Sequence, residues 1–298
     1  MKLFVPSYYK KFKCIADKCR HSCCVDWEID IDDAALLRYT KLTHGYADNI
    51  RGSIEEGERS HFRLGSDGRC PHLDKNGLCE IIKNLGEEYL CDICREHPRF
   101  YNEVPGGFEV GVGASCEEAA RLILSADEYC DIADFEEDSF SKALPYKNEI
   151  REKIYSILSD TESSYTERIS EIYREFGVSP EAISDKEWRK IIRSFEYIDV
   201  KNSEVFSSYS SKLFSLGKEA DAWCERALAY FVFRHCELES GDCEIGFALF
   251  LERLFASLLK ERMPLSFGEA AEILRMISEE IEYSTDNGDI IKNEFLGF

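Results

Sequence analysis

Apolar residues recur at helical spacing through most of the chain after residue 141. The first three segments place them at Ile150, Ile154 and Ile157, then at Ile169, Ile172, Tyr173 and Phe176, and then at Trp188, Ile191, Ile192, Phe195 and Ile198. Gly177 and Pro180 separate the second segment from the third, because both residue types interrupt helices. Segments near residues 218–238, 245–260 and 266–283 continue the pattern, and the last opens with the capping-box pair Ser266 and Glu269.

Before residue 130 the apolar pattern is shorter and is often interrupted by glycine. The spacing of apolar residues from Ile31 to Leu42 predicts a helix, with Asp30 and Asp32 as candidate caps. Residues 79–85 predict a short helix that ends at Gly86. Ser115-Cys116-Glu117-Glu118 has the capping-box form and predicts another helix start. The dipeptides Asp67-Gly68 and Asn76-Gly77 predict tight turns between short extended pieces.

These patterns predict a mainly α protein in two parts. A loop-rich, cysteine-cluster, metal-binding N-terminal domain is expected at residues 1–135, and a helical C-terminal domain at residues 136–298. The boundary is expected within residues 132–141. The chain has no alternation of strands and helices, so a doubly wound nucleotide-binding fold is not expected.

Charge and hydropathy narrow the classes of function. The 298 residues carry a formal net charge of −21, which disfavours nucleic acid as a partner because phosphate contacts need clustered Lys and Arg. The longest apolar runs, residues 227–233 and 245–251, are shorter than the roughly 20 residues that span a bilayer. Residues 1–6 lack the apolar core of a signal peptide. We therefore expect a cytoplasmic protein without a membrane partner.

Cysteine is the main chemical clue in this sequence. Ten of the thirteen cysteines lie before residue 131, and cytosolic thiols are kept reduced, so a dense group indicates metal or redox chemistry. The candidate ligands are Cys14, Cys19, Cys23, Cys24, Cys70, Cys79, Cys91, Cys94 and Cys116. Zinc and iron–sulfur sites each need about four convergent thiolates. The count therefore allows two sites, or one site with spare thiols.

The spacing disfavours zinc without excluding it, so an iron–sulfur cluster is preferred, and we expect the 4Fe–4S type. Two CxxC pairs are typical of structural zinc, whereas here only Cys91 and Cys94 have that spacing. The neighbours Cys23 and Cys24 are not expected to bind one ion together, because adjacent side chains diverge in most backbone conformations. The later residues Cys224, Cys236 and Cys243 lack partners at metal spacing and are expected to pack in the helical domain.

Several sequence strings resemble the flagellin lysine-N-methylase family. They are Pro6-Ser7-Tyr8-Tyr9, Phe12-Lys13-Cys14, Cys19-x3-Cys23-Cys24-x2-Trp27, Asp67-Gly68-Arg69-Cys70-Pro71-His72-Leu73, Gly77-Leu78-Cys79, Leu85 to Arg95, His97-Pro98-Arg99 and Ser115 to Arg121. Farther on, Ala229-Tyr230-Phe231-Val232-Phe233-Arg234 resembles a helix of the family's second half. The strings also resemble a broader family of zinc- or iron-chelating cysteine-cluster proteins, which has no single activity.

The resemblance implies methyl transfer from S-adenosylmethionine to lysine side chains of flagellin or another lysine-bearing protein, with an iron–sulfur cluster in the enzyme. The nearest string to a cofactor glycine motif is residues 108–113, which end in Gly111-Val112-Gly113; without strand–helix alternation this match is weak, and a turn at the end of a strand explains it. A methylase must also deprotonate its lysine. Candidates beside the cysteines are Asp26, Glu28, Asp92 and Glu96, with Trp27, Tyr89 and Tyr101 as aromatic walls. The sequence does not distinguish among these candidates, so the catalytic base stays unknown.

The sequence leaves the roles of two further sets of residues open. His21, His72 and His97 lie near cysteines and could complete a mixed metal site. Arg95 and Arg99 could donate hydrogen bonds to cluster sulfides or bind the carboxylate of an amino-acid-like cofactor. The rival hypothesis is a metal-binding or electron-transfer module without enzymatic activity, whose acidic helical domain docks a partner.

Overall fold

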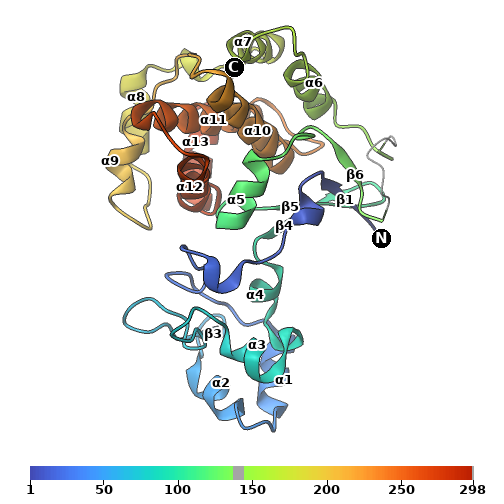
Figure 1. Cartoon of the computed structure of the whole chain (residues 1–298), viewed down its shortest axis with the longest axis vertical. Helices are drawn as coiled ribbons and strands as arrows, with labels where there is room; N and C mark the ends of the chain where they lie inside the picture. The colour runs from blue at the N-terminus through green and yellow to red at the C-terminus, as the bar shows by residue number, and fades with distance from the viewer. Residues whose placement is uncertain (137–143, 297–298) are drawn as a thin grey trace. The chain divides into compact units, whose positions relative to one another are not determined.

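The structure is a computed structural model that describes residues 1–136 and 144–296. Over these residues it contains thirteen α-helices and little β-structure, so the prediction of a mainly α protein is confirmed. The chain forms two compact units, drawn in Figure 1. Met1–Phe12 and Phe100–Phe298 form the first, here called the helical unit, and Lys13–Arg99 form the second, here called the cysteine-rich unit.

The cysteine-rich unit is an insertion into the helical unit. The first twelve residues belong to the helical unit, and the chain returns to that unit at Phe100. The predicted pair of domains, at residues 1–135 and at residues 136–298, stays a prediction. Residues 137–141 of the expected boundary segment lie outside the described residues.

Most helices of the helical unit follow the segments predicted from the sequence. The helices of this unit are α5 (Glu117–Leu124), α6 (Glu149–Leu158), α7 (Tyr165–Phe176), α8 (Asp185–Ile192), α9 (Asn202–Phe206), α10 (Lys218–His235), α11 (Asp242–Arg262), α12 (Phe267–Ile277) and α13 (Thr285–Asn293). Of these, α9 and α13 correspond to no predicted segment. Short 3₁₀ turns lie at Tyr9–Lys11 and Pro180–Ala182, and a π-helical turn follows α12 at Ser278–Glu282.

The core of the helical unit forms around α11. Every residue from 245 to 259 of this helix is buried, and a helix that is buried on all sides needs other elements around it. α10 packs along α11, and α12 and α13 also contact it, as Figure 1 shows. Large aromatic side chains fill the space between the helices; Trp188 of α8, for example, packs against Phe250 of α11.

Serine side chains mark several helix starts. Ser266 and Glu269 form the predicted capping box of α12, and Ser164 and Ser184 cap α7 and α8 in the same way. The predicted cap at Ser115 is wrong. A turn closed by the Cys116 N–H and the Gly113 carbonyl moves the start of α5 to Glu117, so that Cys116 is the N-cap residue.

A four-stranded sheet accompanies the helices. Its strand order is β4 (Arg99–Val104), β5 (Gly107–Val112), β1 (Lys2–Pro6) and β6 (Ile132–Asp134). β1 runs parallel to β5, with Phe4 opposite Glu109, and antiparallel to β6. Because β1 and β5 run in the same direction, the residues that follow Pro6 and Val112 leave the sheet at the same edge.

The cysteine-rich unit consists of short elements around a small core. They are α1 (Asp33–Lys41), α2 (Ala47–Ser53), α3 (Glu80–Leu85), α4 (Asp92–Glu96), β2 (Ile54–Glu55), β3 (His61–Phe62) and 3₁₀ turns at Ala16–Lys18 and Glu87–Tyr89. The predicted cap of α1 is confirmed, because Asp32 accepts a hydrogen bond from the Ala35 N–H at 2.8 Å. Gly68 and Gly77 have φ values of 74° and 79°, which confirms both predicted turns.

Candidate functional site

Five of the predicted cysteine ligands meet in the core of the cysteine-rich unit. Cys70 and Cys91 are buried core residues. Cys24, Cys79 and Cys94 are partly buried and pack against the same core. These five residues are here called the cysteine pocket. They come from four separate stretches of the sequence, so the fold rather than local spacing brings them together.

Hydrogen bonds and helix starts hold the cysteine pocket in place. The Cys70 N–H donates to the Cys24 carbonyl oxygen at 2.8 Å. Cys79 is the N-cap residue of α3 and Cys91 is the N-cap residue of α4. Cys94 lies one helical turn after Cys91, so both face the same side of α4. Helix N-termini favour negative charge, which suits a thiolate at Cys91, whereas burial raises the pKa of Cys79.

The thiols of the cysteine pocket are near enough to change each other's acidity. Burial raises the pKa of Cys70 to about 12, and the neighbouring thiolates of Cys24, Cys79 and Cys91 add to the effect. The hydrogen bond from Cys23 lowers the pKa of Cys24 to about 7. Cys94 donates to Cys91, which lowers the pKa of Cys91 and raises that of Cys94. Several thiolates together in one buried pocket repel each other unless a cation balances their charge.

The remaining predicted ligands lie elsewhere. Cys14 and Cys23 are exposed, and Cys19 is half-buried and donates to the His21 carbonyl oxygen at 3.1 Å. Cys116 belongs to the helical unit. Within residues 1–136 and 144–296, no three His, Cys, Asp or Glu side chains are arranged to hold a metal ion directly. The metal ligands named from the sequence therefore stay a prediction.

His72 has a structural role. Its Nδ1 lies 3.0 Å from the Tyr46 hydroxyl and its Nε2 lies 2.9 Å from the Ser53 hydroxyl, so both ring nitrogens have protein partners. The ring also packs edge-on against Phe62, and burial lowers its pKa to about 4. Of the other two candidate histidines, His97 packs against Trp27 and His21 is exposed.

The charged candidates beside the cysteines mostly pair with each other. Arg95 bonds Asp92 and also lies 3.1 Å from Glu96. Glu28 lies 3.8 Å from His61 Nδ1. Arg99 donates to the Arg95 carbonyl oxygen at 3.5 Å. These contacts favour ordinary surface pairing over a catalytic role for Asp92, Glu96 and Arg95.

A second group of functional candidates lies in the helical unit. It consists of Tyr8, Gly113, Ser115, Tyr230, Arg234 and Glu282, here called the Arg234 cluster. Arg234 Nη1 donates to the Tyr230 hydroxyl at 2.8 Å, and its Nε lies 3.4 Å from a Glu282 oxygen. The guanidinium carbon is 5.0 Å from the centre of the Phe100 ring and 4.7 Å from that of Tyr283. Two aromatic rings and two polar partners thus fix the orientation of this guanidinium.

Glu282 is the buried anion of the Arg234 cluster. It ends the π-helical turn after α12, a type of turn that is often found at functional sites. Its oxygens accept hydrogen bonds from Tyr230 at 2.9 Å and from His235 Nε2 at 2.6 Å. Burial alone would raise the pKa of Glu282, but Arg234 and His235 lower it to about 2. The carboxylate is therefore ionised at neutral pH.

Gly113 is the first residue after β5, and it lies against the Arg234 side chain. A Cβ atom at this position would lie 2.3 Å from the Tyr283 hydroxyl and 2.8 Å from Arg234 Nη1, so only glycine fits without displacement. The next residue, Ala114, donates its N–H to the Tyr230 hydroxyl at 2.9 Å. The glycine string of residues 108–113 thus forms the end of β5 and the turn towards α5, and its role in cofactor binding stays a prediction.

Sequence patterns partly signalled the Arg234 cluster. Tyr8, Ser115 and Arg234 each lie in a string that resembles the methylase family, but the strings are far apart in the sequence. Glu282 and His235 carried no motif. Only the parallel pairing of β1 with β5 and the packing of the helices reveal that these residues meet.

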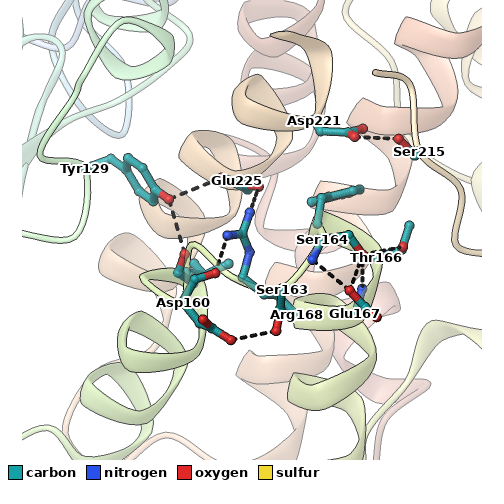
Figure 2. A network of polar contacts seen from close by, with 12 residues as sticks. Tyr129, Asp160, Ser163, Ser164, Thr166, Glu167, Arg168, Ser215, Asp221 and Glu225 are labelled. Atoms are coloured by element: carbon teal, nitrogen blue, oxygen red, sulfur yellow. Dashed lines mark hydrogen bonds and ion pairs between the residues drawn. The ribbon is translucent and has the colours of Figure 1, made fainter. Parts of the chain in front are cut away.

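Two hollows lie on the surface of the described part of the chain. One, of about 420 Å³, lies along α1 beside Leu37 and Arg38. The other, of about 580 Å³, lies between α6 and α7. Figure 2 shows the polar network beside the second hollow, in which Arg168 bonds Glu225 and the Asp160 carbonyl oxygen. The charged groups of this network bond to other groups of the protein, which favours a structural role for the network.

Comparison with known proteins gives partial matches. The chain is 28% identical over 129 residues to a protein named Lysine-N-methylase from Salmonella typhimurium, and matches one from Salmonella choleraesuis equally well. It is 26% identical over 160 residues to the flagellar biosynthetic protein FliU of Salmonella muenchen. The chain is thus similar to lysine-N-methylases. No family model and no solved structure matches it.

These alignments confirm the resemblance to the lysine-N-methylase family, and their extent differs between the relatives. Each methylase match covers 40% of this chain and 32% of the methylase, so the chain spans about a third of those proteins. The FliU match covers 51% of this chain and 94% of FliU. Among the described residues, no helix is long and apolar enough to cross a membrane.

Proposed function

We propose that the protein transfers methyl groups from S-adenosylmethionine to lysine side chains of flagellin or another lysine-bearing protein, and that its cysteine-rich unit holds an iron–sulfur cluster. The observation that carries this proposal is the similarity to two proteins named Lysine-N-methylase, joined by FliU, whose name refers to flagella. Because the chain spans only 32% of each methylase, its activity, substrate and partner are all parts of the proposal.

The residues of the cysteine pocket fit a thiolate-bound cluster. Its five thiols exceed by one the four that a 4Fe–4S cluster uses. Cys70, Cys79, Cys91 and Cys94 are the preferred holders, and Cys24 is the fifth candidate. Iron would balance the charge of thiolates that otherwise repel each other in the pocket. Zinc can use the same soft ligands, so the choice of metal needs a measurement.

The remaining chemistry belongs to the protein. When bound, S-adenosylmethionine supplies a methyl group on a positively charged sulfur, which is open to attack by an amine. The chain must bind the lysine, orient its amine and take up the proton that the ammonium loses, because only the neutral amine is a nucleophile. A net charge of −21 attracts cationic, lysine-bearing surfaces at long range.

The experiment that tests this function uses anaerobically purified protein. We expect the protein to contain iron and acid-labile sulfide. Unmethylated flagellin from the same cell, incubated with this protein and S-adenosylmethionine, should gain methyl masses on lysine in a mass spectrum. Matched incubations use heat-inactivated protein, and other abundant cytosolic proteins as substrates.

The outcomes separate the hypotheses. Stoichiometric zinc without sulfide would contradict the cluster. If neither methyl transfer nor S-adenosylmethionine binding is detected, the methylase proposal fails. Iron and sulfide without methyl transfer would then favour a metal-binding or electron-transfer module. Such a module requires no site beyond the cysteine pocket.

A further inference from the structure

Two neighbouring strands of the helical unit end at the same edge of the sheet. β1 and β5 are parallel, with Lys2 opposite Gly107 and Phe4 opposite Glu109. Tyr8 follows the end of β1 and Gly113 follows the end of β5, so both leave the sheet at this edge. In open sheets with parallel strands, ligands bind outside the carboxyl ends of the strands, where the following helix begins. Here the following helix is α5.

Two buried hydroxyl groups at this edge have no hydrogen-bond partner among the described residues. They belong to Tyr8, whose exposed fraction is 3%, and to Ser115, whose exposed fraction is 6%. Burial raises the pKa of Tyr8, and the charges of Glu282 and Arg234 also act on it, so Tyr8 lies near the Arg234 cluster. Buried polar groups in native proteins nearly always have a partner. Both hydroxyls are therefore placed to bond a polar ligand.

Arg234 supplies the positive charge at this edge. Its contacts with Tyr230 and Glu282 use Nη1 and Nε, and among the described residues Nη2 bonds no acceptor. The Arg234 side chain is 11% exposed, whereas that of Glu282 is fully buried, so of this pair only Arg234 reaches the surface. A guanidinium fixed in one plane matches the two oxygens of a carboxylate.

Gly113 completes the arrangement by its small size. Because this residue has no Cβ, Arg234 Nη1 lies directly over the backbone between β5 and α5. The N-terminal N–H groups of α5 follow within a few residues, and they favour a negative ligand. The end of β5 thus brings together Gly113, the guanidinium of Arg234, the two buried hydroxyl groups and the start of α5.

We infer that the Arg234 cluster binds the α-carboxylate in the methionine half of S-adenosylmethionine. This assignment rests on the function proposed above, which requires that cofactor. Arg234 holds the carboxylate oxygens, Tyr8 and Ser115 donate to them, and Gly113 lets Arg234 lie close to the backbone between β5 and α5. A carboxylate on the partner protein has the same chemistry, and the ligands of the experiment distinguish the two sources.

Isothermal titration calorimetry of the 298-residue chain tests the inference with two ligands. S-adenosylhomocysteine keeps the carboxylate, whereas 5′-methylthioadenosine lacks the amino-acid half. The unmodified protein should bind the first about tenfold or more tightly than the second. Arg234→Gln should remove about tenfold of this preference and leave the affinity for methylthioadenosine unchanged. Arg275→Gln is the matched control, because Arg275 is also buried but pairs with Glu272 and Glu279.

A milder variant keeps the test valid if Arg234→Gln fails to fold. Tyr8→Phe removes only the unpartnered hydroxyl, and it should weaken S-adenosylhomocysteine severalfold without weakening methylthioadenosine. Tyr173→Phe is its control, because the Tyr173 hydroxyl is likewise buried without a partner among the described residues. A purely structural Tyr8 would leave both affinities unchanged.

Each failure has a distinct signature. If the unmodified protein binds neither ligand, the methylase function fails and the carboxylate assignment fails with it. If it binds both but the preference survives in Arg234→Gln and Tyr8→Phe, only the assignment is overturned. The assignment is also overturned if these variants lose affinity equally for both ligands. It is likewise overturned if they bind only flagellin more weakly and both ligands as before.

Discussion

The backbone N–H of Cys70 donates to the carbonyl oxygen of Cys24 at 2.8 Å, although a helix pair and a hairpin separate the two residues in sequence. This bond, together with the neighbouring bridge between Val25 and Arg69, brings the first cysteine string against the second. Main-chain pairing of this kind fixes the distance between the two segments whether or not a metal is bound.

Cysteine-to-serine variants should separate a folding role of the pocket from simple packing. Cys91→Ser should lower the melting temperature of the cysteine-rich unit by about 10 °C or more and remove iron, because metal ligation supplies part of the folding free energy of small loop-rich units. Cys243→Ser should change neither, since Cys243 lies in the helical unit. Differential scanning calorimetry and iron analysis measure both effects. Equal melting of the two variants would contradict a folding role.

Gly113→Ala should destabilise the helical unit by about 1–3 kcal/mol, because the added Cβ must displace Tyr283 and Arg234. Gly268→Ala is the matched control. No atom lies within 4 Å of a Cβ built at Gly268, which sits in the first turn of α12, and alanine favours helix there. Urea unfolding of the two variants measures the difference. Similar free energies of unfolding would show that the close approach at Gly113 is unimportant.

Tyr230→Phe should lower the free energy of unfolding by about 1–3 kcal/mol, because the lost hydroxyl leaves the Ala114 N–H without its acceptor and removes one of the donors to Glu282. Tyr173→Phe should leave stability unchanged or raise it, since that buried hydroxyl has no partner among the described residues. Chemical denaturation of the pair provides the comparison. A stable Tyr230→Phe protein would contradict the proposed hydrogen-bond network.

Glu282 should make the helical unit sensitive to acid. Its pKa is lowered to about 2 in the folded protein, below the 4.5 of an unperturbed glutamate. A lowered carboxyl pKa adds stability that is fully present above pH 4.5 and is lost as the pH falls towards 2. The shift corresponds to at most about 3 kcal/mol.

Urea unfolding at pH 7 and at pH 3 tests this pH dependence in the original protein and in Glu282→Gln. The variant should lose less stability between the two pH values, because its amide does not titrate. Glu279→Gln serves as control, since Glu279 pairs with Arg275 nearer the surface. If all three proteins have the same pH dependence, Glu282 does not contribute to acid unfolding.

The helical pattern was predictable because it is local. The period of 3.6 residues and the Ser266 capping box identify α12 from adjacent residues alone. The turns at Gly68 and Gly77 were predictable for the same reason, since positive φ favours glycine. Ser115 misled the prediction because a preceding turn, invisible in the motif, moved the helix start.

The sites were less predictable because they depend on contacts between distant residues. The cysteine string showed which residue types matter, but its spacing did not show that Cys24 joins the pocket while Cys14 stays exposed. Arg234 and Glu282 meet through the packing of α10 against the segment after α12. Neither residue has a sequence pattern that names the other.

The inserted position of the cysteine-rich unit constrains the order of events during synthesis. β1 needs β5 and β6 as partners, yet the ribosome releases all of residues 13–99 before either strand. The cysteine-rich unit can therefore form its small core while the first strand is still unpaired, because domains fold as units as they emerge. The sheet of the helical unit closes only afterwards, so the nascent N-terminal strand stays open to mispairing until β5 and β6 have been made.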